Sequence, residues 1–190
     1  VKSEKGFPTV QACDEEMLCI TLQDYATKRI LTFGVGPYHH NDPMVKYVQC
    51  NDEYDMLQHF ITYWSANPPE VVTGWNCQLY DIAYLAKRIT RVLGEKSCKK
   101  LSPWGLVTNE EIYLQGRAHT VYDIGGVTVL DYLDLYRKFT YKAQESYKLD
   151  YIGEVELGQK KLDHSEFDTF KDFYTKAWNK FVDYNIQDVR

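Results

Sequence analysis

Hydrophobic and polar positions follow two periods along the chain, and the change from one to the other separates expected strands from expected helices. Residues 17–22 and 29–35 are rich in β-branched and aromatic side chains around a short polar stretch, which predicts an antiparallel hairpin. Residues 46–50 are a third strand candidate. Asn51 offers an N-cap for a helix whose apolar positions recur at helical spacing from Tyr54 onward.

Strand and helix then alternate in the middle of the chain. Residues 71–75 are a short apolar run that fits a buried strand, and the apolar spacing after Ile82 predicts a helix that ends at Gly94. Residues 127–130 and 131–139 repeat the order of strand and helix. This alternation predicts an α/β fold with a mixed sheet flanked by helices.

A polar segment between these strand and helix pairs predicts a protruding β-hairpin. Its extended runs are residues 111–115 and 119–124, and they meet around Gly116 and Arg117. A surface loop of no special function is the alternative.

One helix is expected near the end of the chain. Its apolar stripe begins at Phe170, passes through Phe181 and Tyr184, and reaches Asp188 at the same spacing. A carboxylate that continues a core-facing stripe needs a cation, a metal or hydrogen-bond donors as partners. A frayed chain end, at which the stripe no longer constrains the side chain, is the alternative.

The composition is typical of a folded protein, since 44% of the residues are hydrophobic and 26% are charged. A single domain is expected over residues 1–190. The formal net charge of −5 excludes binding of duplex DNA by overall positive charge, so a nucleic-acid contact must be local or metal-assisted. Five cysteines without CxxC spacing argue against a disulfide framework and a thiolate zinc site, and indicate a reducing cytoplasm. Because no apolar run is long enough to span a bilayer, we expect no membrane partner.

A further carboxylate stands where an α/β sheet presents side chains to a ligand. Asp81 follows the expected strand at residues 71–75 and begins the next helix, which is the place of the ligand crevice in open α/β sheets. A simple helix cap is the alternative. Asp131 and Asp134 lie three residues apart and could bind a cation, although helix capping and surface charge are the favoured interpretation.

The sequence around Asp81 and Asp188 resembles that of a known family. The second exonuclease motif of family B DNA polymerases is similar to the run Thr73-Gly74-Trp75-Asn76 with Tyr80-Asp81. Their third motif is similar to Tyr184-Asn185-Ile186-Gln187-Asp188. Residues 146–151 and 157–162 resemble the connecting stretch of the same family. Residues 129–136 resemble specifically the polymerases of T-even bacteriophages and their relatives. The resemblance is strong over residues 70–190 and weak before them.

The resemblance implies a ribonuclease H-like fold and a 3′-5′ proofreading exonuclease that removes mismatched nucleotides from single-stranded primer ends. It implies that Asp81 and Asp188 are two of the four carboxylates that hold two Mg²⁺ or Mn²⁺ ions in the intact domain, and that Tyr184 orients the attacking water. Asn76 and Tyr80 would line the groove that receives the 3′ end of the DNA. The polymerase domain of the same parent chain would be a partner, in the host cell cytoplasm if a phage encodes it.

One motif of the family is missing from this sequence. The first exonuclease motif, Asp-any-Glu on the central strand, supplies two further carboxylates, whereas the acid pairs at residues 14–16 and 52–53 lie in polar, turn-like context. We therefore expect a fragment of a larger polymerase that begins just after this motif, lacks the central first strand, and hydrolyses DNA slowly or not at all. The two strands beside the missing one would lose their pairing partner and expose backbone hydrogen-bonding groups, which predicts a homodimer or strand exchange.

Positive charge and the hairpin are further candidates for contact with DNA. Lys87, Arg88 and Arg91 would follow a DNA backbone, with a solvated helix face as the commoner explanation. By the resemblance, the hairpin at Gly116 and Arg117 would help to part primer from template. Two rival functions stay open: a nucleic-acid-binding module of the same fold that has lost catalysis, and an RNA-processing nuclease of the same superfamily.

Overall fold

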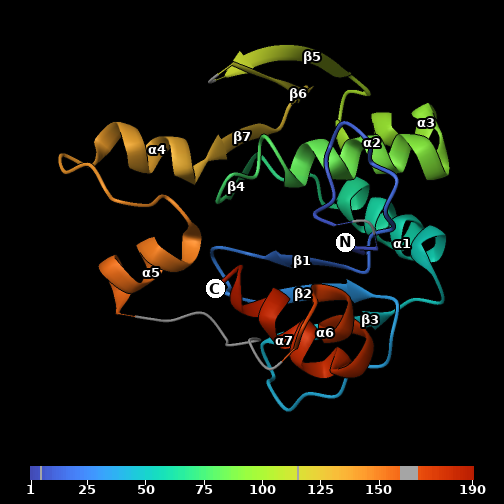
Figure 1. Ribbon diagram of the computed structural model, residues 1–190. Coiled ribbons are helices and arrows are strands. Elements are labelled where there is room, and N and C mark those ends of the chain that lie inside the picture. Colours follow the sequence, from blue (N-terminus) through green and yellow to red (C-terminus); the bar gives the residue numbers. More distant parts are fainter. Residues whose placement is uncertain (5, 115, 159–166) are drawn as a thin grey trace. The chain divides into compact units, whose positions relative to one another are not determined.

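The computed structural model describes residues 1–4, 6–114, 116–158 and 167–190, which form an α/β protein (Figure 1). The strands are β1 (Cys19–Gln23), β2 (Ile30–Gly34), β3 (Val45–Gln49), β4 (Val71–Gly74), β5 (Val107–Leu114), β6 (Arg117–Ile124) and β7 (Thr128–Asp131). The helices are α1 (Glu53–Ala66), α2 (Asp81–Leu93), α3 (Glu95–Cys98), the 3-10 turn η1 (Lys99–Leu101), α4 (Tyr132–Phe139), α5 (Leu149–Leu157), α6 (Phe170–Lys176) and α7 (Trp178–Gln187). The predicted α/β class is confirmed.

The described strands form three separate sheets. β2 is the middle strand of the first sheet, antiparallel to β1 and parallel to β3. β4 pairs with β7 in parallel, and β5 pairs with β6 in the predicted hairpin. The first sheet is mixed, as expected, but the described strands do not all belong to it. β1 and β4 each have a described partner along one edge only.

The chain divides into two compact units. The described residues of unit 1 are 1–4, 6–8, 14–60 and 167–190. Those of unit 2 are 9–13, 61–114 and 116–158. The boundary falls inside α1, and each unit has its own sheet and helices.

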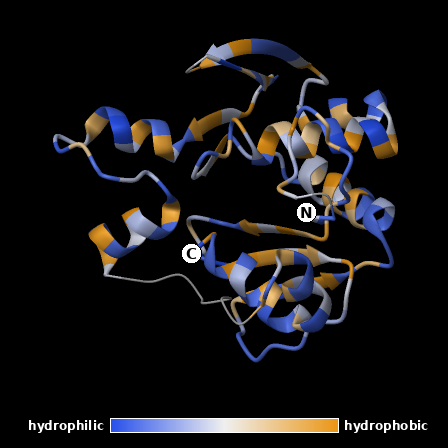
Figure 2. Cartoon of the chain, in the orientation of Figure 1, coloured by the Kyte–Doolittle hydropathy of each residue, from blue (hydrophilic) through white to orange (hydrophobic). Residues whose placement is uncertain are grey.

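The core of unit 1 joins the first sheet to α6 and α7. In Figure 2 the strands of this sheet carry mostly hydrophobic residues. The buried members of the core are Leu18, Cys19, Ile30, Val45, Phe173, Tyr174, Phe181, Val182 and Ile186. These residues lie far apart in sequence, so the last helices hold the amino-terminal strands in place.

The single helix expected from Phe170 is divided in two at Ala177. This residue has φ −136° and ψ 54°, outside the helical region, and it separates α6 from α7. Eight residues of straight helix would place Phe173 and Phe181 about 12 Å apart along the axis. The break brings their ring centroids to 5.8 Å instead, so aromatic packing accounts for the bend.

The first helix begins one residue later than its expected cap implies. Asp52 accepts a hydrogen bond from the backbone N of Asp55 at 2.8 Å, so Asp52 and not Asn51 caps α1. Tyr54 is 55% exposed and does not belong to the buried face. The buried hydrophobic side chains of α1 are Met56, Leu57, Phe60, Ile61 and Trp64.

Unit 2 is built around α2. This helix ends before Gly94, which has φ 86°, as the sequence predicts. Its buried residues are Ile82, Ala83, Tyr84, Leu85, Ala86, Arg88 and Ile89. β4 is not the buried strand that was expected: Val71 is 53% exposed, because β7 is the one described neighbour of this strand.

Removal of a core ring should destabilise unit 1. We expect Phe173→Ala to lower the free energy of unfolding by about 3–5 kcal/mol, because it leaves a cavity among the aromatic rings. Phe139→Ala is the control, since Phe139 is 76% exposed and its loss should change stability by about 0.5 kcal/mol or less. Urea unfolding followed by tryptophan fluorescence measures both, and similar midpoints for the two variants would contradict this account of the core.

Candidate active site

A tight turn between β4 and α2 carries the residues of the second motif. Asn76 has φ 58°, in the left-handed region that asparagine tolerates better than most residues. Its carbonyl accepts a hydrogen bond from the backbone N of Tyr80 at 3.1 Å. A Cβ added at Gly74 would meet the Cβ of Cys77 at 3.0 Å, which is closer than ordinary packing allows. Glycine and asparagine therefore suit their positions in this turn for backbone reasons.

Asp131 holds this turn from the neighbouring strand. The parallel pairing of β4 and β7 places Asp131 opposite Gly74. The buried Asp131 carboxylate accepts hydrogen bonds from the backbone N of Asn76 at 2.9 Å and of Gln78 at 3.0 Å. It also accepts one from the backbone N of Leu133 at 3.0 Å. The last bond caps α4, so the capping interpretation is confirmed, and the contact with the turn adds a function that the sequence did not indicate.

Asp81 is the first residue of α2, and it is exposed. Tyr80 occupies the N-cap position and makes no side-chain cap, so the alternative in which Asp81 is the helix cap is wrong. A carboxylate in the first helical turn is favoured by the helix dipole. The ring of Tyr80 packs on that of Tyr84, with centroids 5.8 Å apart. The packing fixes the start of the helix and leaves the carboxylate at the surface.

The other ionisable side chains of the turn are neutral at physiological pH. Burial raises the pKa of Cys77 to about 12, and the negative charges of Asp131 and Asp81 add to the shift. Burial and the Asp81 charge likewise raise the pKa of Tyr80. Cys77 is therefore a protonated thiol and not a nucleophile, and the negative charge of the turn comes from its carboxylates.

The third motif lies at the end of α7. Tyr184 is half-buried, and its ring meets that of Phe173 edge-on, with centroids 5.8 Å apart. Asp188 stands at the C-cap, where its backbone N donates to the Tyr184 carbonyl at 3.2 Å, and it is exposed. The expectation that Asp188 faces the core is wrong, because this residue is exposed although its backbone conformation is still helical.

The acids of the two motifs belong to different units. Asp81 lies in unit 2, whereas Tyr184 and Asp188 lie in unit 1. Their convergence on one metal pocket therefore stays a prediction, as do their catalytic roles. Carboxylates are hard oxygen donors, which fit Mg²⁺ or Mn²⁺.

Neither of the remaining acid pairs lies in a strand. Asp14 and Glu16 precede β1, and the Glu16 carboxylate forms an ion pair with Lys2 at 2.5 Å. Glu53 is buried at the start of α1, and its Oε1 accepts a hydrogen bond from the backbone N of Met17 at 2.7 Å. These contacts give Glu16 and Glu53 structural functions.

The three basic residues of α2 bind backbone carbonyls of their own unit. The Nζ of Lys87 donates to the Gln11 carbonyl at 2.7 Å. Arg88 and Arg91 each donate through Nη1 to the Cys13 carbonyl at 3.0 Å. Because Arg88 is 6% exposed, the alternative of a solvated helix face is wrong for this residue. A contact of these side chains with DNA stays a prediction.

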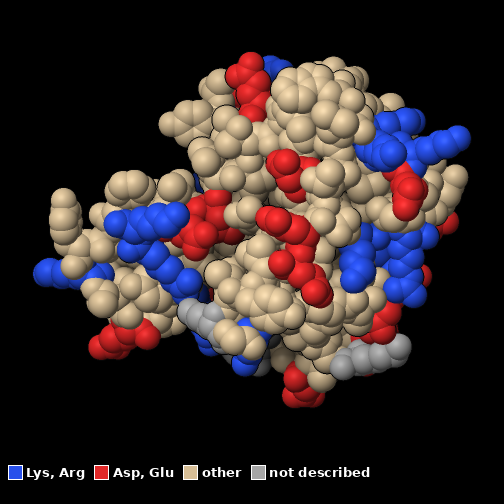
Figure 3. Space-filling model, turned by 90° about the horizontal axis from the view of Figure 1, so that it is seen from above, with Lys and Arg blue, Asp and Glu red and all other residues tan. Residues whose placement is uncertain are grey.

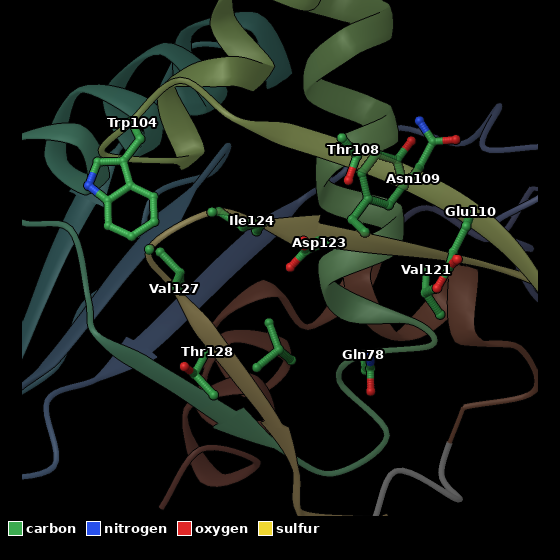
Figure 4. A pocket seen from close by; sticks show the side chains of 14 residues that line it. Gln78, Trp104, Thr108, Asn109, Glu110, Val121, Asp123, Ile124, Val127 and Thr128 are labelled. Atoms are coloured by element: carbon green, nitrogen blue, oxygen red, sulfur yellow. The ribbon is translucent and has the colours of Figure 1, made fainter.

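The β5–β6 hairpin is longer than the sequence suggested, because β5 begins at Val107. Gly116 has φ 75° at the turn and Arg117 begins β6, while Gln115 lies outside the described residues. A pocket of about 900 Å³ extends along the hairpin and the start of β7 to Gln78 (Figure 4). Its side chains include Trp104, Asn109, Glu110, Tyr122, Asp123 and Thr128. The turn of the second motif thus borders this pocket.

Acidic and basic side chains are interspersed on the face that Figure 3 presents. Such mixing fits a local contact with DNA better than attraction by the whole surface. Within the described residues, no helix combines the length and apolar character that crossing a membrane requires.

Comparison with known proteins identifies the family. The sequence profile described as "DNA polymerase family B, exonuclease domain" matches residues 1–152. The chain belongs to this family. The predicted family is therefore confirmed, and the rival of an unrelated RNA-processing nuclease is wrong.

Viral DNA polymerases are among the relatives of this family B exonuclease-domain chain. It is 34% identical over 143 residues to the DNA-directed DNA polymerase of Escherichia phage RB69, and 34% identical over 145 residues to that of Enterobacteria phage T4. These matches cover 75% and 76% of the chain. It is 25% identical over 175 residues, 86% of the chain, to the DNA polymerase catalytic subunit of Psittacid herpesvirus 1. The chain spans 16% of the length of each relative.

Replacement of Asp131 should loosen the turn of the second motif. Asp131→Asn keeps the shape but replaces one acceptor oxygen by an NH₂ group that cannot accept a hydrogen bond from a backbone N–H. We expect the free energy of unfolding to fall by about 1–3 kcal/mol, the typical cost of an unsatisfied buried donor. Asp134→Asn, at an exposed position of α4, is the matched control. Equal denaturant midpoints for the two variants would show that Asp131 does not hold the turn.

Proposed function

We propose that this chain hydrolyses single-stranded DNA from its 3′ end with two divalent ions, as the proofreading exonuclease region of a family B DNA polymerase with a ribonuclease H-like fold. The match to the exonuclease-domain family over residues 1–152 carries this proposal. The polymerase domain of the parent protein would be the partner that delivers the primer end, in the host cell cytoplasm.

The chemistry would rest on the two motif carboxylates and the motif tyrosine. Asp81 and Asp188 would hold Mg²⁺ or Mn²⁺, and a pair of such ions about 4 Å apart stabilises both the attacking and the leaving oxygen of a phosphodiester. Tyr184 would orient the attacking water through its hydroxyl, because Phe173 restrains the ring. Asn76 and Tyr80 would line the path of the 3′ end.

An aromatic cluster beside the second motif supports the choice of single-stranded DNA. Trp75 packs against Tyr136 and Tyr132, with ring centroids 5.7 Å and 6.2 Å apart. Its Nε1 donates to the Tyr147 carbonyl at 3.1 Å, which fixes the indole. Tyr132 is 55% exposed. An exposed ring on a rigid aromatic base is suited to stacking with unpaired nucleobases.

The nuclease proposal is tested with a 5′-labelled single-stranded oligonucleotide, excess chain and Mg²⁺ or Mn²⁺. We expect slow, metal-dependent shortening from the 3′ end, since two of the four carboxylates used by the family are assigned in this sequence. Asp81→Ala and Asp188→Ala should each lower the rate about a hundredfold or more, as loss of one transition-state-stabilising group typically does. Tyr184→Phe should lower it while preserving the packing of the ring.

Asp134→Asn is the control for the nuclease assay, because it removes an exposed carboxylate outside both motifs. Its rate should equal that of the unmodified chain. If the unmodified chain and Asp81→Ala show the same rate while both bind the oligonucleotide, the function is that of a nucleic-acid-binding module without catalysis.

Pairing between two copies of the chain belongs to the same proposal. The edges of β1 and β4 that have no described partner strand carry backbone groups able to extend a sheet. We expect a dimer when multi-angle light scattering is measured during size-exclusion chromatography. A monomer at every accessible concentration would contradict this part of the proposal.

A further inference from the structure

Unit 1 carries a group of metal-ligating side chains that the exonuclease proposal does not use. Cys50, Asp55 and His59 each place one ligand atom within 4.8 Å of the other two. Cys50 directly follows β3, and the other two stand one turn apart on α1. We propose that these three side chains bind a divalent transition-metal ion, and that their sulfur, oxygen and nitrogen donors select Zn²⁺.

The Asp55 and His59 side chains already have the spacing of two zinc ligands. The Oδ1 of Asp55 lies 3.1 Å from the Nδ1 of His59, and the same Nδ1 lies 2.9 Å from the backbone carbonyl oxygen of Asp55. Binding of the ion would therefore replace these hydrogen-bonding contacts of Nδ1 and release its proton. Two ligands that are each about 2.0–2.1 Å from a tetrahedral zinc ion are about 3.3 Å apart. A thiolate would lie about 3.6 Å from either of them. The Cys50 sulfur is within 4.8 Å of both, so a small rotation of its side chain would bring it to the third corner of the tetrahedron.

Neighbouring groups orient two of the three ligands. The backbone N and the Nδ2 of Asn51 donate to the Oδ2 of Asp55 at 2.9 Å and 3.0 Å. This leaves the Oδ1 of Asp55 directed at His59. The backbone N of Cys50 donates to the Gly34 carbonyl of β2 at 2.8 Å, which anchors the cysteine to the sheet. Supporting hydrogen bonds of this kind are typical of metal ligands.

The three ligands differ in their exposure to solvent. Cys50 is buried, the Asp55 side chain is 27% exposed, and the His59 side chain is 51% exposed. The fourth position of the ion is thus open to water. Because Cys50 belongs to the end of β3 and the other ligands to α1, the ion would join the sheet of unit 1 to its first helix.

Only one of the ligands of this site is a cysteine, which explains why cysteine spacing argued against a zinc site. The pattern Cys50-x4-Asp55-x3-His59 combines a residue that ends a strand with an i, i+4 pair on the next helix. The inference stands apart from the exonuclease proposal, because it uses none of the same residues and a different class of metal.

The site is tested by titrating the reduced, metal-free chain with Co²⁺ and then displacing Co²⁺ with Zn²⁺. We expect one bound Co²⁺ with a thiolate charge-transfer band, displacement by Zn²⁺ but not by Mg²⁺, and a higher Tm with Zn²⁺ than without it. Cys50→Ser should abolish the charge-transfer band. His59→Gln, at an exposed position that leaves folding intact, should weaken Zn²⁺ binding about tenfold or more.

Cys98→Ser is the matched control, since Cys98 is also a buried free cysteine but lies on α3. It should bind Co²⁺ and Zn²⁺ as the unmodified chain does, and far-UV circular dichroism checks the fold of each variant. The proposal is overturned if the charge-transfer band is absent from the unmodified chain or persists in Cys50→Ser. Equal Zn²⁺ affinity of His59→Gln and the unmodified chain would overturn it as well.

Discussion

The carboxylate of Asp131 accepts hydrogen bonds from three backbone N–H groups, and the geometry of the second exonuclease motif depends on them. Two of these donors belong to the turn between β4 and α2, and the third begins α4. One buried side chain therefore satisfies donors that two different connections would otherwise leave unpaired. The start of α2, and with it Asp81, takes its position from this arrangement.

In unit 1 the packing of aromatic rings has the corresponding function. The break at Ala177 allows α6 and α7 to bring Phe173 and Phe181 together over the first sheet. Tyr184 joins the same group of rings through its edge-on contact with Phe173. The third motif thus depends on hydrophobic packing, whereas the second depends on hydrogen bonds to a carboxylate.

The charged groups of the protein serve structure as well as chemistry. Arg88 and Arg91 both donate to the Cys13 carbonyl, and so attach residues 9–13 to α2. Such bonds satisfy a guanidinium that would be costly to bury alone. In unit 1, Asn51 and Asp55 set up the proposed zinc site by the same means. The charge of Arg88 or Asp55 does not by itself reveal these contacts, because a charged side chain that contacts only water carries the same charge.

The sequence by itself determined the first hairpin, the end of α2 at Gly94 and the presence of the β5–β6 hairpin, although not its full length, because period and turn residues act locally. It also indicated the family, through the run around Asn76 and Asp81, which lies within the residues that the family profile matches. The tertiary structure alone decided the division of the last helix, the buried side of α1, the contacts of Arg88, and the grouping of Cys50 with Asp55 and His59. These features depend on residues that are distant in sequence, and only packing and strand register bring such residues together.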